Sequence, residues 1–129
     1  LADPPPRKAV TLAATDPANP YGAALGWPKL DGVSHRPGRK AGALVVLVDG
    51  TLVLSLERGG RTVLSFSDDP EVLRAAAADL ATTARSRRLD TLTVEKINGE
   101  GVYGTGLALT LQEAGFVATP RGYTLRKAV

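Results

Sequence analysis

Two apolar runs on either side of Asp49-Gly50 constrain the fold more than any other feature of this sequence. Leu-Val-Val-Leu-Val occupies residues 44–48, and Thr-Leu-Val-Leu-Ser-Leu occupies residues 51–56. Asp-Gly tolerates the positive φ angles of a type I′ turn, so the two runs predict a two-residue β-hairpin. Because a second break at Gly59-Gly60 precedes a third run over residues 62–66, we expect a three-stranded antiparallel meander.

The period of two within the second run predicts which of its side chains face the core. Successive side chains of a strand point to opposite faces. This alternation assigns one face to Leu52, Leu54 and Leu56 and the other to Val53, Ser55 and Glu57. We therefore expect the three leucines to form a single buried face.

A helix is expected directly after the meander. Asp68 and Asp69 are N-cap candidates, and Pro70 suits the first helical turn. Small and apolar residues then recur at helical spacing, namely Val72, Leu73, Ala76, Ala77, Leu80, Ala81 and Ala84. This narrow stripe predicts a helix that approaches a sheet closely.

The rest of the chain predicts one strand, a short helix and a final hairpin. Leu89–Ile97 is typical of a strand, and Thr105 is positioned to cap a helix that continues to Ala114 and ends at Gly115. Phe116–Thr119 and Tyr123–Arg126 are expected to be short strands around a Pro-Arg-Gly turn. The order β-β-β-α-β-α-β-β, with two helices, indicates an α+β fold.

Residues 1–41 are expected to form an extended, irregular, proline-rich arm. They contain seven of the nine prolines, which disfavour helix at the residues before them. Four large apolar side chains in the arm would gain by packing on a neighbouring surface: Tyr21, Leu25, Trp27 and Leu30. We predict that the arm wraps either its own sheet or a preceding domain, and that residues 42–129 form one α+β domain.

Composition limits the chemistry open to the chain. It has no Cys and one His, which argues against disulfides, thiolate chemistry and multi-histidine metal sites. The longest apolar stretch has the length of a strand, and the start Leu-Ala-Asp-Pro-Pro-Pro has neither Met nor the character of a signal peptide. We therefore expect a piece of a longer cytoplasmic protein with no membrane partner.

The segment from Gly99 to Gly104 satisfies the pattern G-x-G-x-x-G of dinucleotide-binding proteins. That pattern also requires an acidic residue about 20 positions further on to hold the ribose, and no Asp or Glu follows Glu113. The segment also lacks the G-K-[ST] of a P-loop. We interpret it as a structural strand-to-helix loop and expect no cofactor or metal site in this chain.

Other catalytic constellations are incomplete in the sequence. A serine-type triad would have to recruit His35 from a proline-flanked loop, and the chain has no G-x-S-x-G nucleophile. Asp49, Asp68 and Asp69 already have structural roles in a turn and a helix cap. A single carboxylate such as Asp31 or Glu95 is the remaining catalytic candidate.

Basic residues gather in three parts of the chain, in a modest excess of sixteen Lys+Arg over thirteen Asp+Glu. They are Arg36, Arg39 and Lys40 after His35, Arg58 and Arg61 around the Gly-Gly turn, and Arg121, Arg126 and Lys127 near the end. If the meander folds as expected, some of them share one rim and bind phosphates without reading sequence. The alternative is a solvated surface with ordinary ion pairs.

Three stretches together resemble the extreme C-terminus of Lhr-type helicases from high-GC bacteria. They run from Thr15 to Pro28, from His35 to Gly50 and from Gly115 to Arg126. The resemblance covers nearly the whole chain, and the first two stretches are long and unusual. It implies a parent protein with a superfamily 2 motor, which uses ATP and Mg to drive 3′-to-5′ movement on single-stranded DNA.

The resemblance also implies where this domain lies in the parent protein. The C-terminal half of such helicases is similar to bacterial crosslink-repair DNA glycosylases, with tandem winged-helix modules followed by a β-barrel-like domain. This chain looks like that last domain, so we expect an antiparallel, barrel-like sheet that neighbours the winged-helix modules. No catalytic residue of the glycosylase family can be carried over to this chain.

Three functional hypotheses follow from these observations. The first is an accessory C-terminal domain of an ATP-dependent DNA-repair helicase, which is not itself an enzyme, supports neighbouring modules or a homo-oligomer, and contributes a basic rim to single-stranded DNA. The second is a component of a base-excision DNA glycosylase. The third is an interdomain or oligomer assembly module that does not meet DNA.

Overall fold

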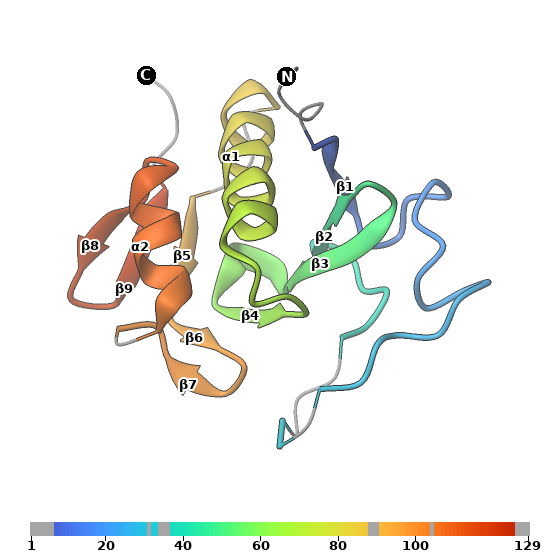
Figure 1. Ribbon diagram of the computed structural model, residues 1–129, viewed down its shortest axis with the longest axis horizontal. Helices are drawn as coiled ribbons and strands as arrows, with labels where there is room; N and C mark the ends of the chain where they lie inside the picture. Colours follow the sequence, from blue (N-terminus) through green and yellow to red (C-terminus); the bar gives the residue numbers. More distant parts are fainter. Residues whose placement is uncertain (1–6, 31, 34–36, 88–90, 104, 126–129) are drawn as a thin grey trace, which may run out of the picture.

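The computed structural model of this chain describes residues 7–30, 32–33, 37–87, 91–103 and 105–125. Within these residues the chain forms a six-stranded sheet, a three-stranded sheet and two α-helices (Figure 1). The elements are β1 (Ala9–Ala13), β2 (Leu44–Val48), β3 (Thr51–Leu56), a 3-10 turn (Arg58–Gly60), β4 (Thr62–Ser65), α1 (Pro70–Ser86), β5 (Leu92–Val94), β6 (Lys96–Ile97), β7 (Glu100–Gly101), α2 (Gly106–Glu113), β8 (Val117–Thr119) and β9 (Gly122–Leu125). The expected α+β class is confirmed.

The predicted meander forms the centre of the larger sheet. β2 pairs antiparallel with β3, and β3 pairs antiparallel with β4. The turn between β2 and β3 has positive φ at both Asp49 (51°) and Gly50 (83°), as a type I′ turn requires. Val48 and Thr51 are paired across it, so the predicted two-residue hairpin is confirmed.

The predicted leucine face of β3 is wrong at Leu52. The register of β2 and β3 shifts between Val46 and Leu47, which leaves Val53 as an extra residue in β3. Such a β-bulge reverses the alternation on one side of itself. Leu54 and Leu56 therefore pack in the main core beneath the helices, whereas Leu52 packs in a second cluster on the opposite face of the sheet.

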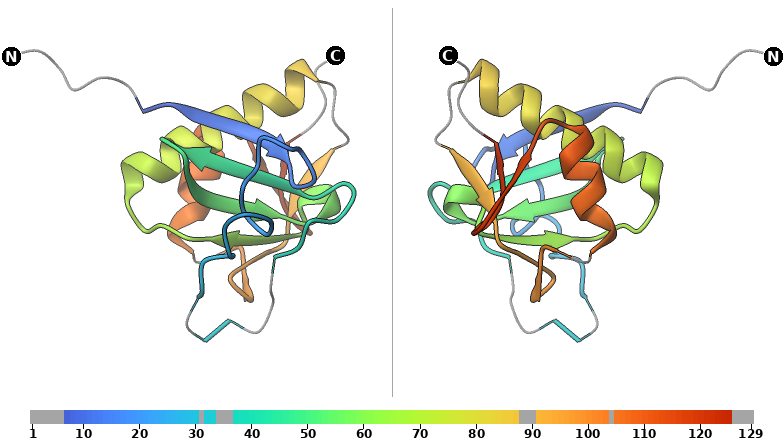
Figure 2. Two further views of the ribbon diagram at one scale, coloured as in Figure 1. Left: turned by 90° about the vertical axis from the view of Figure 1, so that its right-hand side faces the viewer. Right: turned by 90° about the vertical axis from the view of Figure 1, so that its left-hand side faces the viewer.

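The arm is less irregular than expected because Ala9–Ala13 form β1, which pairs antiparallel with β2 at the edge of the sheet. Thr11, only 2% exposed, donates its hydroxyl to the Asp79 carboxylate on α1 at 2.8 Å. The blue part of the arm that follows β1 lies over the face of the sheet opposite α1 (Figure 2, left), where Tyr21 and Trp27 pack on the cluster that contains Leu52. The larger sheet is consequently covered on both faces.

The predicted helix is confirmed as α1. The Asp69 side chain caps its first turn by accepting a hydrogen bond from Glu71 N, and Pro70 is its first residue. Its buried side chains are Leu73, Ala76, Ala77, Leu80, Ala81 and Ala84, which is the predicted stripe without Val72. No helix within the described residues is long and apolar enough to cross a membrane.

The predicted strand Leu89–Ile97 is interrupted at Glu95, and its two parts enter different sheets. β5 pairs with β9 in the three-stranded sheet, whereas β6 runs parallel to β4 in the six-stranded sheet. The larger sheet is therefore mixed rather than antiparallel. Its outer strands among the described residues, β1 and β7, do not pair, so the expected barrel-like closure is not confirmed.

The C-terminal elements follow the prediction closely, with one addition. α2 is followed by the hairpin of β8 and β9, as expected. The addition is a hairpin of β6 and β7 that turns at Asn98 (φ 52°) and Gly99 (φ 84°). Gly99 and Gly101 of the G-x-G-x-x-G segment therefore belong to a hairpin, whereas Gly104 lies outside the described residues.

Candidate nucleic-acid interface

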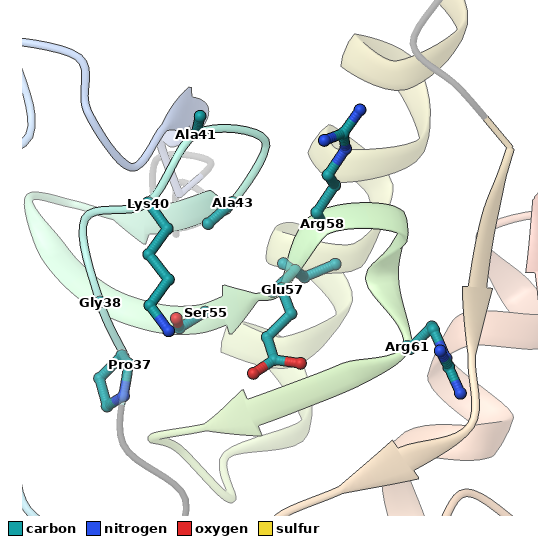
Figure 3. A pocket seen from close by; sticks show the side chains of 10 residues that line it. Pro37, Gly38, Lys40, Ala41, Ala43, Ser55, Glu57, Arg58 and Arg61 are labelled. Atoms are coloured by element: carbon teal, nitrogen blue, oxygen red, sulfur yellow. The ribbon is translucent and has the colours of Figure 1, made fainter.

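An open hollow of about 300 Å³ lies between the segment that precedes β2 and the end of β3 (Figure 3). Its charged lining consists of Lys40, Glu57, Arg58 and Arg61, and the Ser55 hydroxyl belongs to it as well. In Figure 3 the Lys40 side chain extends toward Ser55, whereas Arg58 and Arg61 point outward in different directions. The cations are therefore spread along the surface instead of converging on one point.

Glycines shape this hollow at two places. Gly42 has φ +85°, and a Cβ there would lie 2.7 Å from Cγ of Arg58, so only glycine lets the Arg58 stem come so close. Gly59 and Gly60 also have positive φ, and they turn the chain between β3 and β4. The Gly-Gly break in the sequence thus places Arg58 and Arg61 at one end of the sheet.

A second hollow of about 290 Å³ adjoins the first. It is lined by Glu57, Arg61, Thr62, Glu95 and Lys96, and it shares Glu57 and Arg61 with the first hollow. We call the two hollows together the basic groove, whose cations are Lys40, Arg58, Arg61 and Lys96. All four are exposed. Lys40, Arg58 and Arg61 were predicted site residues, whereas Lys96 was not.

Glu95 lies at the end of the basic groove between two arginines. Its carboxylate is 2.9 Å from Nε of Arg61 and 3.8 Å from Nη2 of Arg121, and its side chain is 27% exposed. Arg121 lies in the turn between β8 and β9, and Arg61 directly precedes β4. The ion pairs of Glu95 with these two arginines therefore link the three-stranded sheet to the six-stranded sheet. The Glu95 carboxylate thus contacts two guanidinium groups. Asp31, the other carboxylate candidate, lies outside the described residues.

Arg39 does not belong to the basic groove. Its guanidinium donates to the carbonyl oxygens of Asn19 at 2.8 Å, Tyr21 at 3.0 Å and Asp16 at 3.3 Å. These contacts hold the arm in place and leave the charge partly buried. Of the other predicted cations, Arg36, Arg126 and Lys127 lie outside the described residues, as does His35.

Two of the four large apolar residues of the arm, Tyr21 and Trp27, pack on the chain's own sheet. Tyr21 and Trp27 stack with ring centroids 6.5 Å apart and contact the cluster that contains Leu52. The Tyr21 hydroxyl also accepts a hydrogen bond from Leu52 N at 3.2 Å. Leu30 is half-buried and Leu25 is 48% exposed, so Leu25 is the one of the four that stays largely open to solvent.

Tyr103, like Lys96, was not among the predicted site residues. The residue is 50% exposed, and its hydroxyl donates to the carbonyl oxygen of Thr119 and lies 3.3 Å from that of Gly122. The only available signal was an aromatic residue within a glycine-rich segment. Within the described residues, no group of three or more His, Cys, Asp or Glu is placed to hold a metal ion.

Comparison with known proteins places this chain beside a segment of two much longer ones. It is 54% identical over 129 residues to a protein of Mycolicibacterium smegmatis named "Lhr helicase/ probable uracil glycosylase", which covers 95% of this chain and 8% of that protein. It is 39% identical over 115 residues to "Lhr helicase/uracil glycosylase" of Escherichia coli, which covers 88% of this chain and 7% of that protein. No protein-family model matches the chain.

Proposed function

We propose that this chain is the accessory C-terminal domain of an ATP-dependent 3′-to-5′ DNA helicase, because it is similar to a segment of less than a tenth of the length of two proteins named Lhr helicase. We further propose that the parent protein acts in DNA repair in the cytoplasm. In this proposal ATP hydrolysis belongs to other parts of the parent protein, and this domain supports neighbouring winged-helix modules or a homo-oligomer and contacts the DNA backbone.

The observation that supports a backbone contact is the basic groove. Its cations are exposed and separated, and they come from three segments of the chain that the fold brings together. A nucleic-acid strand presents its phosphates one after another, so it suits a row of separate cations better than a small anion does. Contacts of this kind give affinity without base specificity, and they weaken as salt displaces them.

The test is the salt dependence of single-stranded DNA binding. We expect Lys40→Gln with Arg58→Gln to weaken binding similarly for unrelated sequences. If each residue neutralises one phosphate, the salt slope falls in magnitude by about 1.4. The matched control is Arg74→Gln with Arg87→Gln, which removes the same charge from α1 and its C-cap. We call Lys40→Gln with Arg58→Gln the groove variant. Equal affinities and salt slopes for the groove variant and the control would contradict the proposal and favour the assembly-module hypothesis.

The names of both relatives favour base excision as a second candidate activity of the parent protein. Of the two carboxylates that the sequence left as catalytic candidates, Glu95 is the one within the described residues, and it lines the basic groove. Uracil release by the full-length protein should then fall when Glu95 is replaced by Gln. An unchanged rate of release would assign the glycosylase chemistry to other parts of the parent.

A further inference from the structure

We propose that Tyr103 is a stacking platform for one unpaired nucleobase, and that the domain therefore prefers single strands to duplexes. This inference rests on the proposed contact between the basic groove and the DNA backbone. It adds a role for an aromatic side chain that contacts the turn carrying Arg121.

The Tyr103 ring is held firmly but remains accessible. Its hydroxyl donates to the carbonyl oxygens of Thr119 and Gly122, which lie on either side of the turn between β8 and β9. The ring of Tyr123, itself 8% exposed, lies 5.2 Å away at 41° and supports Tyr103 from the core. Because half of the Tyr103 surface remains exposed, the ring offers a pre-oriented aromatic surface to solvent.

Two sets of contacts connect Tyr103 to Glu95, which lines the basic groove. The turn that accepts the Tyr103 hydroxyl carries Arg121, and Arg121 approaches the same Glu95 oxygen that accepts from Arg61. In addition, the residue before Tyr103 donates its backbone N–H to the Glu95 carbonyl at 2.9 Å. A strand that follows the cations of the groove toward Arg121 therefore arrives beside the Tyr103 ring.

The chemistry of this arrangement favours an unpaired strand. A base can stack on a protein side chain only when it is not already stacked within a duplex, and every base has a π face. A cationic groove that ends on an aromatic ring is the combination that proteins use to bind single strands without sequence preference. Duplex DNA would use the cations and leave the ring without a partner.

The test compares two substitutions at Tyr103 with a control on α2. Tyr103→Leu should weaken the binding of a mixed-sequence single-stranded oligonucleotide about tenfold, within the range measured for loss of one stacked base. Tyr103→Phe keeps the ring, so its affinity for the oligonucleotide should stay within about twofold of that of the unsubstituted chain. Leu109→Ala removes an apolar side chain that is 68% exposed and should have no effect. The salt slope should not change in any of them, because no phosphate contact is lost.

Fluorescence provides an independent readout that does not require the leucine variant to fold. Oligonucleotides with single 2-aminopurine substitutions should lose fluorescence when they bind to the unsubstituted chain or to Tyr103→Phe, because stacking on the ring quenches the analogue. If quenching occurs at no position, or if Tyr103→Leu weakens duplex and single-strand binding equally, the stacking role is wrong. If the groove variant weakens binding and Tyr103→Leu does not, the backbone contact stands and the stacking role falls. If the parent chain binds no oligonucleotide at low salt, both proposals fail.

Discussion

Replacing Gly122 by alanine should disrupt the junction of β5 and β9. Gly122 is the buried first residue of β9 and has φ +151°, a conformation that side chains rarely adopt. A Cβ there would lie 2.1 Å from the carbonyl oxygen of Val94 and 2.9 Å from its carbon, both atoms of the neighbouring strand. Carbon and oxygen normally approach to about 3.3 Å, so the strands would have to separate by about 1 Å.

The expected cost combines two effects. Overpacking against well-ordered backbone costs about 1–3 kcal/mol, and the backbone angle adds about 1 kcal/mol. We therefore expect Gly122→Ala to lower the free energy of unfolding by about 3 kcal/mol, which corresponds to about 10 °C in Tm for a chain of this size. Urea denaturation followed by circular dichroism measures this directly, as a lower midpoint with an unchanged m-value.

Two other glycines separate the clash from the backbone angle. Gly50 has φ +83° and open space where a Cβ would lie, so Gly50→Ala should cost about 1 kcal/mol. Gly101 also has open space and has no positive φ, so Gly101→Ala should leave stability within about 0.5 kcal/mol of the parent chain. A cost for Gly122→Ala no larger than that for Gly50→Ala would refute the close approach of β9 to Val94.

Two further substitutions test the charges around the basic groove. Glu95→Gln should tighten single-strand binding about threefold or more at low salt, because it releases Arg61 and Arg121 for phosphates, and the gain should shrink as salt is raised. Weaker binding in that variant would show instead that Glu95 positions Arg61. Arg39→Gln should destabilise the chain by about 2 kcal/mol and shift the emission of Trp27, the only tryptophan, to longer wavelength as the arm loosens. An unaltered emission spectrum would mean that the carbonyl contacts of Arg39 do not hold the arm.

The features that the sequence predicted well are those with a local physical cause. Asp49-Gly50 defines a hairpin because both residues tolerate positive φ, and Asp69-Pro70 marks a helix start because a carboxylate can cap the first turn. Asn98-Gly99 carries the same type of local signal for the β6–β7 hairpin. Gly99 was predicted to lie in a strand-to-helix loop instead, because the overlapping G-x-G-x-x-G pattern dominated the interpretation of that segment.

The features that the sequence did not predict depend on distant contacts. The bulge at Val53 arises from the register with β2, and nothing within β3 itself marks it. The strand Ala9–Ala13 forms because β2 offers it an edge and Asp79 accepts from Thr11, more than sixty residues away. The roles of the basic residues were also set by distant partners. Arg39 donates to carbonyl oxygens of the arm, whereas Arg61 pairs with Glu95. The two arginines have the same side chain, so the sequence alone does not distinguish their roles.

The division of one extended segment between two sheets at Glu95 also limits how the chain can change in length. Residues before Glu95 are fixed by the register with β9, and residues after it are fixed by the register with β4. One inserted or deleted residue would turn every following side chain to the opposite face until a loop absorbed the shift. The described residues of the connection between β1 and β2 belong to no named strand, so a strand register does not restrict their number. We therefore expect insertions and deletions in natural homologues to accumulate in that connection and to be excluded between Leu92 and Ile97.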